Sequence, residues 1–321
     1  MTDSDSTMDN LNYLLTIENL TVRGGNGFEL RVPSLSVALG DVLGIVGANG
    51  SGKTSLIESV LGLRDRVSGS VQLFGRDQSE TAKSVDSLRR VGVQLQTVCY
   101  SENFKVRELV DLHRLMYGTV KDGVRHSLGI EELHKLSYGK LSRGQKQRVD
   151  LYMALAHEPT LAVLDEPGTG LDHGFQNAFS ALLAARAANP RVTTVICTHA
   201  SLELDACNRV LWLKAGQVNK LIERRKHGSE LRPLIANKLR VKTAPAEAAL
   251  VHAIIASHPG VLHHEKLDPL SVLIYGQDAI GELVDVLKRH PAVEDIEVYQ
   301  AGNSDFLRLV TLDSERKAIA A

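Results

Sequence analysis

The sequence predicts an α/β protein in which a buried sheet carries helices on its faces and a small α+β domain follows. A β-branched run, Val42–Val46, leads into a glycine-rich loop and then into the helically spaced stretch Lys53–Leu63. Two further apolar runs, Thr160–Leu164 and Thr193–Cys197, are typical of buried parallel strands. Strand and helix patterns alternate again after residue 237. This order favours a sheet covered by helices, followed by a second, smaller core.

Further elements extend the predicted fold on both sides of the glycine-rich loop. The stretches Leu14–Val22 and Phe28–Val37 alternate apolar and polar residues as strands do, and the segment Gly24–Gly27 between them predicts a turn. Helical spacing returns at Arg107–Tyr117 and at Gln145–Ala156. These patterns together give an alternation of strands and helices over the first two thirds of the chain.

Composition and charge limit the classes of function. Of 321 residues, 43% are apolar and 23% are charged, with a formal net charge of −1. So balanced a charge creates no field that attracts nucleic acid or anionic lipid. Because no run of 18 or more apolar residues occurs, we expect any membrane-spanning part to be a separate chain. The polar N-terminus and the unpaired spacing of Cys99, Cys197 and Cys207 favour a cytosolic protein with reduced thiols.

A change of composition at Glu223–Asn237 predicts a domain boundary. This stretch is basic and irregular, and we interpret it as a solvated linker rather than a phosphate-binding patch. We expect a disordered N-terminus at 1–12, a large domain at 13–222, the linker at 223–237 and a small α+β accessory domain at 238–321. The accessory domain is expected to contain, in order, strand Lys238–Thr243, helix Ala246–Ser257, strand Val261–Tyr275, helix Ala279–Arg289 and strand Val293–Tyr299.

The loop Gly47–Thr54 fits the phosphate-binding pattern GxxxxGK[ST]. Glycines let successive backbone N–H groups approach phosphate oxygens, and the helix N-terminus that follows adds a favourable dipole. Lys53 would contact the β- and γ-phosphates, and the Thr54 hydroxyl is placed to ligate Mg²⁺. By itself this motif indicates a nucleoside triphosphatase. The candidate nucleotide-binding residues here are Gly47, Asn49, Gly50, Ser51, Gly52, Lys53, Thr54 and Ser55.

Two acidic residues, Asp165 and Glu166, directly follow the apolar run Leu161–Leu164. An unpaired charge at the end of a buried strand costs free energy. A bound Mg²⁺ that pairs with the carboxylate would explain why Asp165 stands at this position. Glu166 lies one residue further on and points in another direction. It is therefore our candidate for the general base that activates the attacking water.

A third motif, Leu141–Gln145, reads LSRGQ and is followed by a helix. Ser142 has the chemistry of an N-cap and Gly144 allows close backbone approach, which together suit an anion. With the loop and the acids, this motif resembles the ATP-binding cassette (ABC) family, whose signature is LSGGQ. The resemblance covers residues 14–221. It implies a P-loop NTPase cassette with a RecA-like core and a helical subdomain.

The resemblance also implies how the motifs act together. MgATP would lie between two protomers arranged head to tail, and Ser142, Gly144 and Gln145 of one protomer would close on the γ-phosphate held by the other. We expect a homodimer rather than a heterodimer. The partner would be an integral membrane permease, which would hold the protein peripherally at the cytoplasmic face of the cell membrane. No nucleic-acid partner is expected.

Three further positions match the family in order. Gln96 resembles the glutamine that contacts Mg²⁺ and the attacking water, with Gln94 as the competing choice. Asp172, in Gly170-Leu171-Asp172, resembles the loop that crosses the dimer interface. His199 matches the switch histidine that contacts the γ-phosphate. We therefore interpret Gln96 and His199 as catalytic, Gln96 also as a metal contact, and Asp172 as part of the nucleotide site.

Two positions depart from the family pattern. The aromatic residue that usually stacks on adenine after the first strand is replaced by Arg23 or Gly24. Phe28 is the nearest substitute, with a core residue as the alternative interpretation. Gly168 stands where Thr or Ser is frequent, without an obvious loss of a catalytic group.

The branch of the family is indicated by two segments. Residues 91–96, followed by residues 102–109, are similar to single-cassette exporters of the daunorubicin-resistance and polysaccharide-export types, and residues 304–311 partly match their C-terminal string. This similarity implies ATP hydrolysis that drives export through the permease. The alternatives are an importer ATPase, a soluble ribosome- or DNA-associated ATPase, and a binding module without turnover. A single cassette without sustained heptads disfavours the soluble class, and intact Glu166 and His199 disfavour the inactive module.

Overall fold

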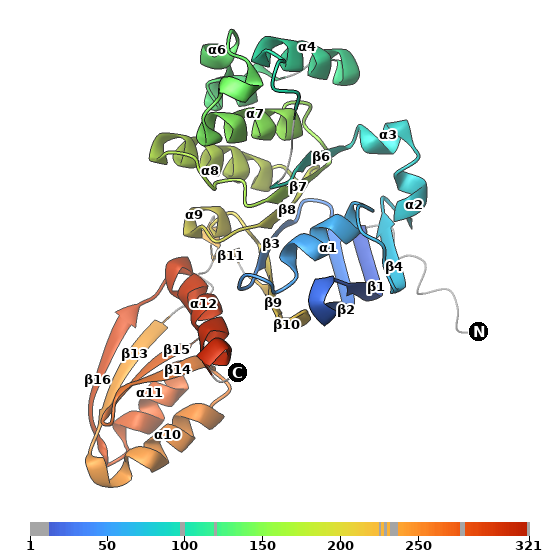
Figure 1. Cartoon of the computed structure of the whole chain (residues 1–321). Helices are drawn as coiled ribbons and strands as arrows, with labels where there is room; N and C mark the ends of the chain where they lie inside the picture. The colour runs from blue at the N-terminus through green and yellow to red at the C-terminus, as the bar shows by residue number, and fades with distance from the viewer. Residues whose placement is uncertain are drawn as a thin grey trace. The chain divides into compact units, whose positions relative to one another are not determined.

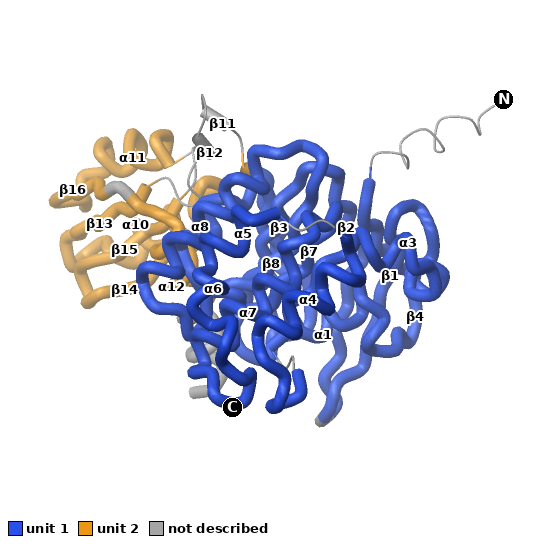
Figure 2. Tube along the Cα trace, turned by 90° about the horizontal axis from the view of Figure 1, so that it is seen from above, with its two compact units in different colours: residues 1–223 blue, residues 224–321 orange. Residues whose placement is uncertain are grey.

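The computed structural model describes residues 13–96, 100–118, 121–224, 226–227, 230–231, 237–276 and 280–319. The N-terminus predicted to be disordered, Cys99 and much of the predicted linker lie outside these ranges. The chain divides into two compact units, residues 1–223 and residues 224–321 (Figure 2).

A mixed sheet forms the frame of the first unit. Its strands are β1 (Tyr13–Arg23), β2 (Glu29–Ala38), β3 (Val42–Val46), β4 (Ser68–Leu73), β5 (Arg76–Asp77), β6 (Val91–Gln94), β7 (Leu161–Asp165), β8 (Thr193–Cys197), β9 (Arg209–Lys214) and β10 (Gln217–Glu223). In the described part of the chain they follow the order β5-β4-β1-β2-β10-β9-β3-β8-β7-β6. The neighbours from β9 to β6 pair in parallel, and β1 pairs antiparallel with β2 and β4. The parallel half positions the candidate site.

Helices cover the parallel half and extend beyond it. They are α1 (Lys53–Val60), α2 (Gln78–Thr81), α3 (Val85–Leu88), α4 (Val106–Tyr117), α5 (Asp122–Ser127), α6 (Ile130–Leu133), α7 (Arg143–Leu155), α8 (His173–Ala187) and α9 (Ser201–Leu204), with 3-10 turns at Gly25–Gly27 and Tyr138–Lys140. Figure 1 shows α4, α6 and α7 grouped beside β6 and β7 as a separate helical layer. The predicted α/β cassette with a helical subdomain is confirmed.

Burial explains why the central strands could be recognised. Every residue of β3, β7 and β8 is buried, so these strands read as continuous apolar runs rather than as alternating patterns. Their side chains join one core with those of β1, β2 and α1. The predicted helix from Lys53 ends at Val60, three residues earlier than its apolar spacing suggested.

The second unit has a core of its own. Its elements are β13 (Asn237–Thr243), a 3-10 turn (Pro245–Glu247), α10 (Ala248–Ser257), β14 (Val261–Asp268), β15 (Ser271–Gly276), α11 (Ile280–Lys288), β16 (Val293–Gln300) and α12 (Asn303–Ile319). The strands form an antiparallel sheet in the order β14-β15-β13-β16, a ferredoxin-like β-α-β-β-α-β arrangement. Side chains of α10 and α11 pack with β13 and β15. Ahead of this sheet, β11 (Lys226–His227) pairs with β12 (Glu230–Leu231).

Two sequence predictions for this unit were wrong or incomplete. The single strand expected at Val261–Tyr275 is a hairpin, because the backbone turns where Asp268 Oδ1 accepts a hydrogen bond from the Leu270 N–H at 2.8 Å. The helix α12 was not foreseen. Its Phe306 is buried, and its Asp305 lies 3.4 Å from Lys238 of β13.

Candidate functional site

The phosphate-binding loop connects β3 to α1 under tight steric limits. Gly50 (φ +76°) and Gly52 (φ +106°) adopt left-handed backbone conformations that residues with a Cβ rarely adopt. At Gly47 the limit is space, because a Cβ would lie 2.5 Å from the Leu213 carbonyl oxygen. Gly52 is also the N-cap of α1. The loop therefore presents backbone, not side chains, at the positive end of the helix.

Two side chains of the loop, those of Ser51 and Lys53, are buried. Lys53 is only 6% exposed, and its Nζ donates to the carbonyl oxygens of Gly47 (2.8 Å) and Ala48 (3.3 Å). Burial lowers the pKa of Lys53, and the neighbouring acidic groups oppose that shift. Ser51 Oγ is buried without a hydrogen-bond partner among the described residues. A lysine and a free hydroxyl at a helix N-terminus fit a phosphate group.

Asp165 ends β7 directly opposite Thr54 of α1. The Thr54 hydroxyl donates to Asp165 Oδ2 at 3.1 Å, while Oδ1 is buried without a nitrogen or oxygen donor in the described part of the chain. Burial raises the pKa of Asp165, and the Thr54 hydrogen bond opposes the rise. A carboxylate oxygen left unpaired beside a hydroxyl is a donor set that suits Mg²⁺.

The protein would supply only some of the ligands that coordinate such an ion. Within the ranges that the structure describes, no three His, Cys, Asp or Glu side chains gather as a metal site. An ion held by Thr54 and Asp165 would take its other ligands from phosphate oxygens and water, as Mg²⁺ commonly does in nucleotide sites.

Glu166 and His199 come together beside this pair. Glu166 has φ +52°, an uncommon conformation for a residue with a side chain, and its N–H donates to the Cys197 carbonyl oxygen at 2.9 Å. His199 follows β8, and its Nε2 lies 3.5 Å from Glu166 Oε1. Burial and the charge of Lys53 lower the pKa of His199, while Glu166 raises it. Both side chains keep partial exposure, so a ligand and water can reach them.

The topology explains why these distant residues meet. In the sheet, β8 lies between β3 and β7, and all three are parallel. Their carboxyl ends therefore face the same edge, which in open α/β sheets is where ligands bind. The phosphate loop follows β3, the two acids end or follow β7, and His199 follows β8.

A polar pocket of about 540 Å³ opens beside the two acids. Gln94 and Gln96 both line it, together with Asp165, Glu166 and side chains of α7. Gln94 is 1% exposed and its Oε1 has no partner among the described residues, whereas Gln96 is exposed. Both glutamines thus border the same space, and the choice between them remains a prediction.

The LSRGQ motif forms the N-terminus of α7. Ser142 Oγ accepts from the Gln145 N–H at 3.3 Å, and Gln145 Oε1 accepts from the Ser142 N–H at 2.9 Å, which is a capping box. A Cβ at Gly144 would lie 2.6 Å from the Gly170 carbonyl oxygen, so the motif packs directly on the loop that leads to Asp172. Asp172 itself caps α8 through the Phe175 N–H at 3.0 Å.

The motif and the phosphate loop are not joined within one chain. In the described ranges, no hydrogen bond or ion pair connects Ser142, Gly144 or Gln145 with the loop Gly47–Thr54. The single chain therefore presents two separate helix N-termini, which is what an arrangement shared between protomers requires.

Phe28 lies where the loop meets α1. Its half-buried ring packs against the first core and approaches Gly52, where a Cβ would lie 3.1 Å from the ring, and also Gly216. The ring therefore borders the site while belonging to the packing. Its predicted contact with adenine remains a prediction.

One buried acid near the site was not foreseen. Glu203 of α9 is 4% exposed, and burial raises its pKa to about 7, while hydrogen bonds from Thr198 and from the Gly168 N–H oppose the rise. A Cβ at Gly168 would overlap the Glu203 carboxylate. The departure at Gly168 was the sequence signal for this contact, but nothing in the sequence pointed to its partner.

Comparison with known proteins gives a consistent family. Residues 30–169 match the ABC transporter family. The tungstate uptake system ATP-binding protein TupC of Peptoclostridium acidaminophilum is 30% identical over 212 residues, which cover 64% of this chain and 97% of TupC. The bacitracin transport ATP-binding protein BcrA of Enterococcus faecalis is 32% identical over 199 residues, 61% of this chain and 64% of BcrA.

Solved structures share the fold. An ATP-binding subunit of an ABC transporter superposes with a TM-score of 0.58 at 22% identity, covering 65% of this chain and 90% of its own. A bacterial Atm1-family ABC exporter with ATP bound gives a TM-score of 0.57 at 20% identity, covering 66% of this chain and 39% of its own. In the ranges that the structure describes, no helix has both the length and the apolar character that a bilayer crossing needs.

Proposed function

Because the chain belongs to the ATP-binding subunits of ABC transporters, we propose that it hydrolyses MgATP in sites shared by two protomers and so drives export through a separate permease. The observation that carries this proposal is the meeting of Thr54, Asp165, Glu166 and His199 at one sheet edge. These groups supply a metal ligand pair, a base and a phosphate contact within one site.

Each group has a chemical task in this proposal. The loop N–H groups and Lys53 hold the phosphates, and Mg²⁺, held by Thr54 and Asp165, would neutralise charge on the phosphate oxygens. Glu166 accepts the proton of the attacking water. His199 lies 3.5 Å from Glu166, and from there it can orient the γ-phosphate toward that water.

The dimer completes each site. One chain carries one phosphate loop and one capped α7 N-terminus, and in the part of the chain that the structure describes no hydrogen bond or ion pair joins them. In a head-to-tail homodimer, Ser142, Gly144 and Gln145 of each protomer would close on the γ-phosphate held by the other. The positive end of α7 would then stabilise the phosphate charge.

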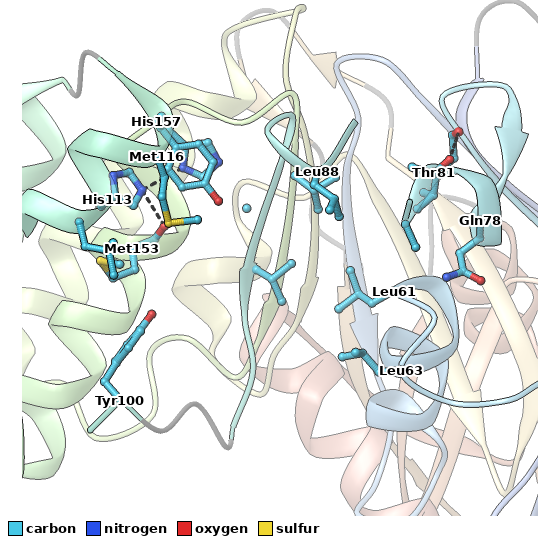
Figure 3. Close-up of a pocket in the computed structure, with 17 residues that line it drawn as sticks. Leu61, Leu63, Gln78, Thr81, Leu88, Tyr100, His113, Met116, Met153 and His157 are labelled. Carbon is cyan, nitrogen blue, oxygen red and sulfur yellow. Dashed lines mark hydrogen bonds between the residues drawn. The ribbon is translucent and has the colours of Figure 1, made fainter. Parts of the chain in front are cut away.

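An apolar pocket of about 570 Å³ supports the permease as partner (Figure 3). It is lined by α4, by β6 and by the end of α1, including Leu61, Leu112 and Met116. Leu112 and Met116 are 44% and 49% exposed, which is unusual for large apolar side chains gathered in one place. We propose that an apolar segment of the permease docks here and holds the protein at the cytoplasmic face of the membrane.

The direction of transport is the finer part of the proposal. TupC is named for uptake and BcrA for bacitracin transport, so relatives of this chain are named for more than one process. Export is supported by the exporter-like segments 91–96 and 102–109 and by an accessory domain at 238–321, joined to the cassette domain (13–222) through the linker 223–237. Reconstitution with the permease in vesicles, with substrate flux measured in each direction, tests export against import.

A substitution on α4 tests the partnership. Leu112→Glu should abolish co-purification with the permease while leaving basal ATP hydrolysis intact. Leu115→Glu is the matched control, since Leu115 lies on the same helix, is 84% exposed and does not line the pocket. If both variants lose co-purification with the permease, or if both retain it, docking in this pocket is contradicted.

A further inference from the structure

A buried carboxylate lies between the two strand ends that carry Glu166 and His199. It belongs to Glu203, which is 4% exposed and lies against Gly168, where a Cβ would be 2.2 Å from Glu203 Oε1. The polar groups of Thr198 and Gly168 favour its ionised form, against the effect of burial. Gly168 lies two residues after Glu166, and Thr198 directly precedes His199. Burying a carboxylate is costly unless it is hydrogen-bonded, and simple packing does not require one at this place.

We propose that Glu203 is a positioning residue for ATP hydrolysis, tying the segment after Glu166 to the strand end that carries His199. This inference rests on the proposed function, because it assigns Glu203 a role only if those two residues act in hydrolysis. The contacts of Glu203 described above involve neither Glu166 nor His199 directly. Glu203 would therefore act on the positions of those two side chains through the backbone.

The contacts of Glu203 reach both sides of the site. A Cβ at Gly168 would lie 2.2 Å from Glu203 Oε1, so the carboxylate lies directly against Gly168, and the polar groups of Gly168 and Thr198 favour its ionised form. Thr198 Oγ1 in turn accepts a hydrogen bond from the Ala200 N–H at 2.9 Å. Glu203 thereby links the segment that follows Glu166 to the residues beside His199. The 3.5 Å approach of His199 to Glu166 depends on both segments holding their places.

The backbone conformation and the surroundings of Gly168 support the same conclusion. Its φ is not in the left-handed region, so backbone conformation does not require glycine. Among the described residues, the atoms that a Cβ at Gly168 would meet within 4 Å belong to the Glu203 carboxyl group. Glycine at 168 is therefore explained by the space that Glu203 occupies, and the two residues form one unit.

Four variants test the proposal: Glu203→Ala, Glu203→Gln, Gly168→Ala and the double variant Glu203→Ala/Gly168→Ala. We expect Glu203→Ala and Gly168→Ala each to lower kcat by about tenfold or more, since small misplacements of reacting groups are costly. Affinity for a non-hydrolysable ATP analogue should stay unchanged. Glu203→Gln keeps one acceptor oxygen and should retain more activity than Glu203→Ala. Leu202→Ala, exposed on the same helix, is the control that should keep wild-type kcat.

The double variant gives the decisive readout. If both single changes break the same bridge, the double variant should be no slower than the slower single variant, because effects within one unit do not multiply. Wild-type kcat in Glu203→Ala, multiplied effects in the double variant, or a parallel loss of analogue affinity would overturn the proposal. Should Glu203→Ala fail to fold, Glu203→Gln and Gly168→Ala decide the question by the same criteria.

A parallel measurement separates this inference from the proposed function. If Glu166→Gln hydrolyses ATP at a rate near that of the wild type, Glu166 is not the base, and the site assignment of the proposed function is wrong. If Glu166→Gln is inactive while the Glu203 and Gly168 variants turn over at the wild-type rate, only the inference fails.

Discussion

The hydroxyl of Thr54 donates a hydrogen bond of 3.1 Å to Oδ2 of Asp165, although 111 positions separate the two residues in the sequence. The contact exists because β8 places β3 and β7 two strands apart with their carboxyl ends at the same edge. It joins the phosphate loop to the acid pair, and Asp165 Oδ1 stays buried without a nitrogen or oxygen donor among the residues that the structure describes.

Asp165→Asn should separate stability from function. Burial raises the pKa of Asp165, so its ionised form is unfavourable in the folded protein at neutral pH. The amide removes that charge and still accepts from Thr54. Without Mg²⁺ the variant should therefore unfold at a higher temperature than the wild type, yet lose Mg²⁺-dependent ATP hydrolysis. A lower unfolding temperature in the absence of Mg²⁺ would contradict this account of Asp165.

Asp150 predicts a pH dependence of stability. It is 8% exposed, accepts a hydrogen bond from the Tyr138 hydroxyl at 3.0 Å, and has a pKa that burial raises from 3.8 to about 6. A carboxyl whose folded pKa is raised stabilises the protein only while protonated. That contribution is lost as pH rises from about 4 to about 6.

Asp150→Asn removes this titration but keeps an acceptor for Tyr138. At pH 7 its free energy of unfolding should exceed that of the wild type by up to about 3 kcal/mol. The difference should vanish below about pH 3, where the wild-type carboxyl is protonated in both states. Denaturant titrations across this pH range measure it. If the difference in the free energy of unfolding between the variant and the wild type does not change with pH, the titration of Asp150 is not its cause.

Mixing two inactive variants tests the shared site. In a dimer of one Lys53→Ala chain and one Ser142→Arg chain, both lesions fall in one composite site and the other stays intact. An equal mixture should recover roughly a quarter of wild-type ATPase activity if subunits exchange freely in a head-to-tail dimer. A mixture of Lys53→Ala and Glu166→Gln is the control and should stay inactive, since each site then has one lesion. No recovery in the first mixture would speak against shared sites.

Removal of the second unit should leave a folded cassette. The two units have separate cores, and every candidate phosphate contact lies before residue 200. A chain ending after Glu223 keeps β10 and should bind ATP as the full chain does, with weaker dimerisation or weaker coupling to the permease. Nucleotide affinity and dimer fraction of both chains are the measurements. Loss of ATP binding in a folded truncated chain would show that the accessory domain contributes to the site.

The sequence predicted those parts of the fold whose signals are local. The strands β3, β7 and β8 are buried on both faces and therefore read as apolar runs, and the glycines of the loop are required by its backbone. The roles of the residues that follow these strands could then be predicted from the order of the motifs along the chain. The distances between those residues could not be predicted, because they depend on which strands become neighbours in the sheet.

Other features depend on tertiary contacts that no local pattern records. Glu203 lies on a helix of one turn, and its burial against Gly168 is visible only in the structure. The hairpin at Asp268 was hidden because the residues on both sides of the turn have strand character. The sequence does not predict the helix α12 (Asn303–Ile319), because residues 304–311 give only a partial match to an exporter string.

The central claim, hydrolysis with Glu166 as base, is tested most directly by comparing Glu166→Gln with the wild type in ATP binding and single-turnover hydrolysis. The amide cannot accept the proton of the attacking water, so the hydrolysis rate should fall by about 100-fold or more. ATP affinity should persist, and the variant should accumulate as a closed, ATP-bound dimer. Hydrolysis by Glu166→Gln at a rate near that of the wild type would contradict the account and remove Glu166 from the role of base.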